Sequence, residues 1–180
     1  MPKIFTTKNF SDQFIRLSSA LASDAKFWRW GDDNMFPYAL ALMSRRSTTH
    51  RRLINDKADY IAGKGFTYTD GQERLGSFIE RINGKGETLR QLISRLAFDK
   101  SLFGNAFVEI VTDPSRSFLA LFHQDASRCR VARDHKRILL HHDWTRFKES
   151  EAKSIPLYPE FGDGDDGHLR YIIHYKDYEP

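Results

Sequence analysis

The stretch that decides the fold is Leu102-Phe103-Gly104-Asn105-Ala106-Phe107-Val108-Glu109-Ile110-Val111, because a helical pattern ends and a strand pattern begins within it. Upstream, apolar residues recur every three or four positions, as on one side of a helix that starts near Thr88: Leu89, Leu92, Ile93, Leu96, Ala97 and Phe103. Gly104 can adopt the left-handed backbone conformation that closes many helices, and asparagine is the next most tolerant residue. The residues from Phe107 to Val111 are typical of a strand, in which Glu109 would face solvent or be paired. We therefore expect a helix packed beside the strand that follows it.

The residues before this junction indicate mostly helix. Residues 1–26 are polar and weakly patterned, so we expect an N-terminal arm, followed by one folded domain over residues 27–180. The elements expected in the first part of this domain are helices at about 37–45 and 48–62, a strand at 66–69, and an amphipathic helix that Gly84 stops. Asp32, Asp33 and Asn34 are candidate caps for the first of these helices, whose first turn contains Pro37.

The residues after the junction indicate a meander of strands. We expect strands at 118–122, 128–133, 137–142 and 169–175, with a hairpin turn at 133–136. The segment from Trp144 to Tyr158 reads as irregular, and the glycine- and aspartate-rich segment 162–167 as an acidic loop. The predicted fold class is therefore α+β, with N-terminal helices packed on a mainly antiparallel sheet.

Composition fits one folded domain. The chain has 180 residues, 40% of them hydrophobic, which is enough to bury a sizeable core. A net charge of +4 suits an ordinary surface, and equally contact with nucleic acid or an acidic partner. Cys129 is the single cysteine, which excludes an internal disulfide and a multi-thiolate metal site. No apolar run has the length of a signal peptide or a membrane span, so we expect a soluble protein without membrane contact.

The densest basic cluster comprises Arg45, Arg46, His50, Arg51 and Arg52. It is either a solvated helix surface or a contact for phosphate groups or for a neighbouring subunit.

The sequence matches none of the catalytic or metal-binding patterns considered for its histidines, aspartates and cysteine. Neighbouring His141 and His142 in a strand would point to opposite faces, and no histidine pair has the spacing of two ligands on one helix face. The aspartates that begin at Asp163 do not match a calcium-binding loop, because its fifth and sixth positions would be Gly167 and His168. Cys129 fits a buried strand thiol. We expect no catalytic residues, no metal and no cofactor.

Three stretches carry a resemblance to a known family. The first is Trp30-Gly31-Asp32-Asp33-Asn34 with Pro37, followed by helices that end in Gly63-Lys64-Gly65-Phe66; the second is Leu102 to Glu109; the third is Arg128 to Arg133, followed by Arg170-Tyr171-Ile172-Ile173-His174. In this order, across roughly residues 28–175, they resemble the portal proteins of tailed double-stranded DNA phages and prophages. The structural positions of the motif would be Trp30, Gly31, Asn34, Pro37, Gly104 and Asn105.

The resemblance implies a structural protein and not an enzyme. Such proteins form a ring, usually a dodecamer, at one vertex of the capsid, and DNA is packaged and ejected through it. The implied partners are further copies of the chain, the terminase large subunit, capsid, scaffold and head-completion proteins, and non-specifically passing double-stranded DNA. The implied location is the virion, after synthesis in the cytoplasm of the bacterial host. The family's central stem and clip helices have no counterpart here, so the resemblance implies a wing-region fragment that is truncated before them.

Two other functions stay open. One is a stand-alone nucleic-acid-binding α+β module that uses Arg45, Arg46, Arg51 and Arg52 together with Trp28 and Trp30. The other is an enzyme, which would need a metal among the histidines. For the basic cluster, the resemblance favours a subunit or capsid interface over DNA, because wing domains generally lie away from the channel.

Overall fold

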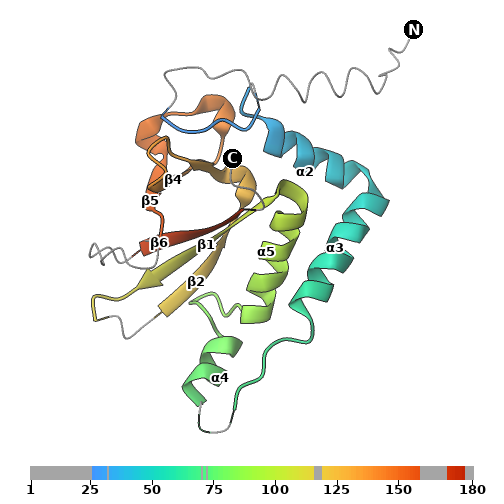
Figure 1. Ribbon diagram of the computed structural model, residues 1–180, viewed down its shortest axis with the longest axis vertical. Helices are drawn as coiled ribbons and strands as arrows, with labels where there is room; N and C mark the ends of the chain where they lie inside the picture. The colour runs from blue at the N-terminus through green and yellow to red at the C-terminus, as the bar shows by residue number, and fades with distance from the viewer. Residues whose placement is uncertain are drawn as a thin grey trace.

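The fold is α+β, as predicted, with helices in the first part of the chain and strands in the second (Figure 1). The computed structural model describes residues 26–31, 33–69, 71, 73–115, 119–158 and 170–176. The helices are α2 (Phe36–Arg46), α3 (Thr48–Ala62), α4 (Glu73–Glu80) and α5 (Leu89–Phe103). The strands are β1 (Asn105–Thr112), β2 (Leu119–Gln124), β3 (Cys129–Val131), β4 (Arg137–Leu140), β5 (Lys153–Pro156) and β6 (Arg170–Lys176). Three short 3₁₀ helices are η1 (Ala126–Arg128), η2 (Trp144–Arg146) and η3 (Glu149–Glu151). The predicted arm up to residue 25 and the acidic loop 162–167 lie outside the described residues.

The helix–strand junction forms as the sequence indicates. A capping box opens α5: the Thr88 hydroxyl accepts from the Gln91 amide, and the Gln91 side chain accepts from the Thr88 amide. Gly104 closes the helix in the left-handed conformation at φ 71°, and its amide donates to the Lys100 carbonyl at 3.0 Å. The chain enters β1 at the next residue, so α5 packs along the strand that follows it.

The strands form two three-stranded antiparallel sheets, in the orders β2-β1-β6 and β3-β4-β5. Alternation along β1 separates two cores. Ala106 and Val108 face α5 and pack with Ile82, Leu92 and Leu96. Phe107 faces the other way and joins Ile172 of the same sheet to Cys129, Ile138 and Ile155 of the second sheet. The central sheet is therefore covered by helix on one face and by the second sheet on the other.

Two predicted elements are corrected. Residues 66–69 form no strand. The Tyr68 ring instead packs so closely on Gly76 of α4 that a Cβ there would clash with it. Strand β5 lies inside the segment expected to be irregular. Of its four residues, only Ile155 strongly favours a strand. The predicted turn at 133–136 is confirmed, with Ala132 donating to the Arg137 carbonyl at 2.9 Å.

Helix α4 ends at Glu80, four residues before Gly84, because the following loop covers the outer edge of the central sheet. The Leu121 amide of β2 donates to the Ile82 carbonyl at 3.0 Å, and the Asn83 side chain donates to the Leu121 carbonyl at 2.9 Å. These bonds satisfy backbone groups that an edge strand would otherwise expose.

Within the described residues, every helix is too short or too polar to cross a membrane.

Candidate functional site

Arg130 lies at the centre of the polar interior. It sits on β3 and is fully buried. Its Nε donates to Asn34 Oδ1 at 2.5 Å and its Nη2 to the Asn34 carbonyl at 2.9 Å, while Nη1 donates to the carbonyls of Ser127 and Cys129 at 3.0 and 2.7 Å. The rings of Trp30 and Trp144 lie 5.4 and 4.7 Å from the guanidinium carbon. Among the described residues, no carboxylate contacts it. Burial lowers the Arg130 pKa to about 10, so the group stays charged at neutral pH.

The first motif stretch supplies the acceptors for this guanidinium. Asn34 is buried at φ 62°, and its Oδ1 also accepts from the Trp30 amide at 3.2 Å. Asn34 is not the helix cap that was predicted: Met35 occupies that position and no side chain caps α2 there. The reason is that leaving the N–H donors of a buried guanidinium without acceptors costs more free energy than leaving the exposed N–H groups of a helix end to water. Gly31 at φ 86° turns the chain, and buried Pro37 lies in the first turn of α2, as predicted.

The second motif stretch links helix, strand and the last strand. The Asn105 side chain donates to the Phe103 carbonyl at 3.2 Å, and its Oδ1 lies 2.8 Å from His174 Nε2 on β6. The His174 ring stacks on Phe107, with centroids 4.4 Å apart. Asn105 therefore holds the end of α5 against the far edge of the central sheet.

All three motif stretches meet in one core. Trp30 from the first, Phe103 and Phe107 from the second, and Cys129, Val131 and Ile172 from the third belong to the same apolar cluster. The three stretches are far apart in the sequence, and the structure brings them together around β1 and β3.

The basic cluster lies elsewhere. Arg45 and Arg46 end α2, and Arg51 and Arg52 lie in the first turns of α3; all four are exposed. Arg52 makes the only ion pair shown for these four arginines with a described residue, to Asp56 at 3.6 Å between two exposed side chains. Trp30 is at the opposite end of α2, where its carbonyl accepts from the Phe36 amide. Ten residues of helix separate the two ends by about 15 Å.

Both tryptophans, Trp28 and Trp30, are half-buried and contact other side chains of the same chain. The Trp28 indole donates to His135 Nε2 at 3.1 Å, and the Arg133 guanidinium lies 4.6 Å from its ring. Trp30 packs on Arg130, as described above. The structure therefore does not join Trp28 and Trp30 to the arginines in one groove.

A buried acid, Glu109, connects the two sheets. Glu109 is only 3% exposed, and one carboxylate oxygen lies 3.0 Å from Lys153 Nζ of β5 and 2.9 Å from an Arg170 nitrogen of β6. The Gln124 side chain of β2 donates to the other oxygen. Of the two alternatives expected for Glu109, the paired one is correct. An acid in the middle of an apolar strand was the signal for this network in the sequence.

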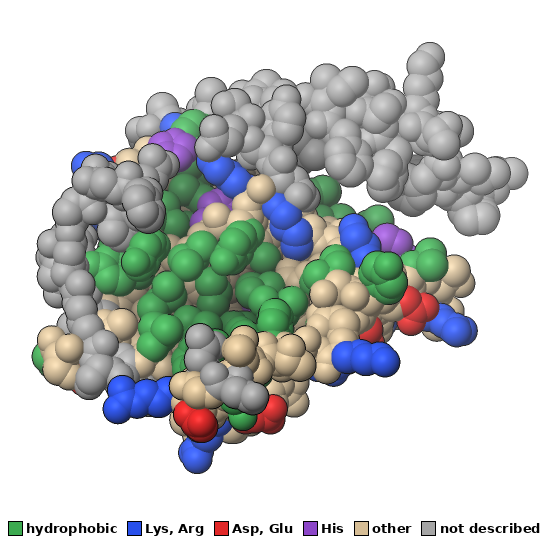
Figure 2. Space-filling model, turned by 60° about the horizontal axis from the view of Figure 1, so that its bottom comes forward, with side chains coloured by type: hydrophobic (Ala, Val, Ile, Leu, Met, Phe, Trp, Pro, Cys, Tyr) green, Lys and Arg blue, Asp and Glu red, His purple; other side chains and the backbone are tan. Residues whose placement is uncertain are grey.

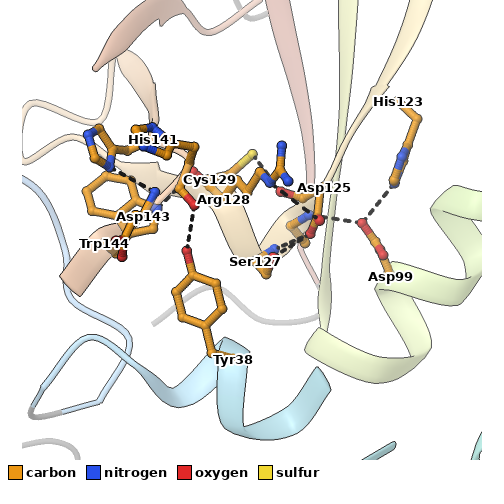
Figure 3. Close-up of polar contacts among 12 residues, drawn as sticks. Tyr38, Asp99, His123, Asp125, Ser127, Arg128, Cys129, His141, Asp143 and Trp144 are labelled. Carbon is orange, nitrogen blue, oxygen red and sulfur yellow. Dashed lines mark hydrogen bonds and ion pairs between the residues drawn. The ribbon is translucent and has the colours of Figure 1, made fainter. Parts of the chain in front are cut away.

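Asp99 is a further buried acid, which sequence reasoning missed. It lies on the apolar side of α5, three residues after Leu96, and that position was the available signal. Its Oδ2 is 2.8 Å from His123 Nε2 and accepts from the Ala126 amide at 3.0 Å. The nearby Ser127 hydroxyl donates to Asp125 and not to the histidine (Figure 3). The Asp99–His123 pair therefore connects α5 and β2, and no hydroxyl or thiol of a described residue hydrogen-bonds to it.

The adjacent histidines correct one prediction. Strand β4 ends at Leu140, so His141 and His142 are not on opposite faces; their rings stack with centroids 4.7 Å apart. His141 is buried, its Nδ1 accepts from the Asp143 amide, and its Nε2 is 3.8 Å from Glu151. In Figure 3 His141 and Asp143 lie on the far side of Asp125 and Ser127 from Asp99 and His123. Over the described part of the chain, no group of three metal-ligating side chains comes together.

Cys129 is a buried strand thiol, as predicted. It is fully buried and donates to the Asp125 carbonyl at 3.4 Å. Burial raises its pKa well above the ordinary value of a thiol, which leaves it in the unreactive protonated form.

Comparison with known proteins finds no family model that matches this chain and no significant match among curated proteins.

Proposed function

We propose that this chain is a structural subunit of a phage or prophage portal, belonging to its wing region. In this role it is part of the ring through which DNA is packaged and ejected, and on which terminase and head-completion proteins dock. It acts by shape and assembly, and the ATPase that drives packaging belongs to terminase. Its place is the capsid vertex of the virion.

The observation that carries this proposal is the convergence of the three motif stretches on one core. Residues as far apart as Trp30 and Ile172 pack in the same cluster, and Asn34 and Arg130, 96 positions apart, are hydrogen-bonded. A resemblance made of unrelated fragments gives no reason for them to meet. Their meeting supports treating them as one structural unit, which is how a family motif behaves.

The surface of the chain supports a role in assembly. Large hydrophobic side chains are at least 41% exposed at Leu42, Met43, Leu53, Tyr60, Ile61, Phe66, Tyr68, Leu75, Leu119, Tyr158 and Tyr175. Figure 2 shows hydrophobic side chains gathered across the middle of one face of the molecule. Contiguous apolar surface of this kind is typical of protein–protein contacts, and a ring subunit has two neighbours to bury it.

The stand-alone nucleic-acid-binding module receives less support. Its base-stacking residues would be Trp28 and Trp30, whose rings contact Arg133 and Arg130 of the same chain. Trp30 also lies at the opposite end of α2, about 15 Å of helix, from the arginines that were to accompany it.

The test is the assembly state of the product of the complete reading frame in the source genome, purified from an expression host. Light scattering and negative-stain electron microscopy should show a closed ring with a central channel. The same product with Arg130→Ala, which removes the contact between the first and third motif stretches, should lose the ring, whereas Arg137→Ala should keep it. A complete product that stays a monomer or a small oligomer at all protein concentrations contradicts the proposal.

A further inference from the structure

The corner where α2 meets α3 concentrates positive charge on the surface. We name it the arginine corner and define it as Arg45, Arg46, His50, Arg51 and Arg52. Ser47 alone separates the two helices, and all five side chains are exposed. No aspartate or glutamate occurs from residue 34 to residue 55. The Arg52–Asp56 pair, at 3.6 Å between mostly exposed side chains, neutralises little of this charge.

The placement of these charges on α3 is unfavourable for the helix itself. The first turn of α3 has no acidic residue, and Arg51 and Arg52 follow it directly. Positive side chains near a helix N-terminus oppose the helix dipole, whereas an anion there is stabilised by it. At the start of α3 an anion would therefore be stabilised, whereas Arg45 and Arg46 already lie at the end of α2 that favours positive charge.

The arginines of α3 are also separate from its exposed apolar residues. At about 100° per residue, Arg51 and Arg52 lie about 160° and 100° around the helix from Leu53. Only Ile54, Ala58 and Ala62 of α3 are buried, so both sides of the helix are open. An interface with an acidic protein surface would be expected to mix charge with apolar contact, as at the rim of a hydrophobic patch. On α3 neither arginine is in line with Leu53, whereas on α2 the exposed Leu42 and Met43 lie within one turn of Arg45 and Arg46, so the ionic contact is centred on α3.

We propose that the arginine corner binds the phosphate backbone of double-stranded DNA without reading its sequence. The corner spans eight residues around one helix junction, and arginine side chains from two helix ends can reach successive phosphates. The tryptophans that might have stacked on bases are engaged elsewhere, so the contacts are to phosphate alone. This inference departs from the subunit or capsid interface that the resemblance favours for the cluster. It does not depend on the portal proposal, since a ring can assemble with or without DNA at this corner.

The experiment measures fluorescence anisotropy of two labelled 20-base-pair duplexes of unrelated sequence, titrated with the full chain at 50 and 200 mM salt. Both duplexes should bind equally. Four phosphate contacts predict a loss of affinity of about 100-fold between the two salt concentrations. The variant R51Q/R52Q should bind more weakly, with a salt slope lower by about two, and R45Q/R46Q should behave in the same way.

The matched control is R74Q/R81Q, which removes two exposed arginines from α4 and its C-terminal end, outside the corner. It should leave affinity and salt slope unchanged. Absence of binding at 50 mM salt overturns the inference, as does an equal loss in the control pair, which would reveal a general effect of net charge. Competition by polyglutamate at equal charge concentration, as effective as that by unlabelled duplex, would assign the corner to an acidic protein partner instead. DNA binding by a complete product that forms no ring would leave this inference standing while the portal proposal falls.

Discussion

Arg130 shows how a buried charge can be held without an opposite charge from any of the residues that the structure describes. Its four hydrogen bonds go to the carbonyls of Asn34, Ser127 and Cys129 and to one amide oxygen, and two indole rings flank it. Each neutral acceptor contributes less than a carboxylate does, but together they bond all three nitrogens of the guanidinium. The arrangement connects the segment before α2 to β3, so Arg130 stabilises the contact between two distant parts of the chain.

Replacing Arg130 should therefore be costly. Arg130→Ala leaves buried acceptors unpaired and a cavity between two tryptophans, and should lower the free energy of unfolding by about 3–5 kcal/mol. Urea denaturation at pH 7 measures the change. Arg137→Ala is the matched control on the neighbouring strand, because Arg137 is exposed and pairs with Asp134 at 2.9 Å; it should cost less than about 1 kcal/mol. An equal loss in the free energy of unfolding for the two variants would show that Arg130 does not stabilise the contact between these parts of the chain.

His174 makes stability depend on pH. Burial lowers its pKa to about 4, and the positive charges of Lys176 and Lys100 act in the same direction. In the unfolded chain the residue titrates near its ordinary value of 6.5. Between these values the unfolded state binds the proton and the folded state does not, so stability is full above pH 6.5 and is lost as the pH falls toward 4. The loss at pH 5 should be about 2 kcal/mol.

The measurement is urea denaturation of the wild type and His174→Gln at pH 7 and pH 5. Glutamine keeps a donor for Asn105 Oδ1, 2.8 Å from the histidine nitrogen, but cannot be protonated. The variant should lose about 2 kcal/mol less than the wild type on acidification. A pH dependence that is the same in both proteins would assign the effect to other groups.

At the scale of elements, the sequence predicts well those elements whose pattern is strong within a few residues. Helix α5 has a capping box, a continuous apolar stripe and a glycine stop, and all three are in the structure. The predictions for Lys153–Pro156 and for residues 66–69 were wrong for the same reason: whether a short segment forms a strand depends on whether another strand pairs with it. Lys153–Pro156 is a strand because it pairs with β4, and Phe66 and Tyr68 have no strand to pair with.

The Glu109 network is a side-chain polar contact between the two sheets. Its carboxylate on β1 reaches Lys153 of the second sheet as well as Arg170 of its own. Glu109→Gln removes the negative charge but keeps the shape, so two cations lose their partner. The free energy of unfolding should fall by about 2–4 kcal/mol. Lys153→Met, at a half-exposed position, should cost less than half as much; a reversed order in urea denaturation would contradict a network centred on Glu109.

At the scale of the whole molecule, the residues of the first motif stretch have structural roles, but the sequence did not always indicate the right role. Trp30, Gly31, Asn34 and Pro37 are all structurally engaged, but the role given to Asn34 was a local helix cap. Its actual partner, Arg130, is 96 positions away. Such a pairing leaves no periodicity in the sequence, because it is decided by which strands and loops come together in three dimensions. The arginine corner was predictable for the opposite reason, since its residues are neighbours in the chain.

Cys129 can report whether the helices and both sheets unfold as one unit. Its thiol is fully buried between the sheets, packed with Phe107, Ile138, Ile155 and Ile172, and is the only one in the chain. If the domain is cooperative, a thiol reagent reaches Cys129 only through global unfolding, and the native chain should react at least about 1,000 times more slowly than the urea-unfolded chain.

The urea dependence of that labelling rate distinguishes the possibilities. Under global unfolding, its slope should equal the equilibrium m-value, because the full buried surface must be exposed before reaction. If the second sheet separates on its own, the rate should be higher and the slope shallower. Tyr60→Cys in a Cys129→Ala background, at a site 89% exposed, supplies the rate for a free thiol in the folded protein. Because the two sheets share one core and the Glu109 contacts, we expect the steep dependence of a single cooperative unit.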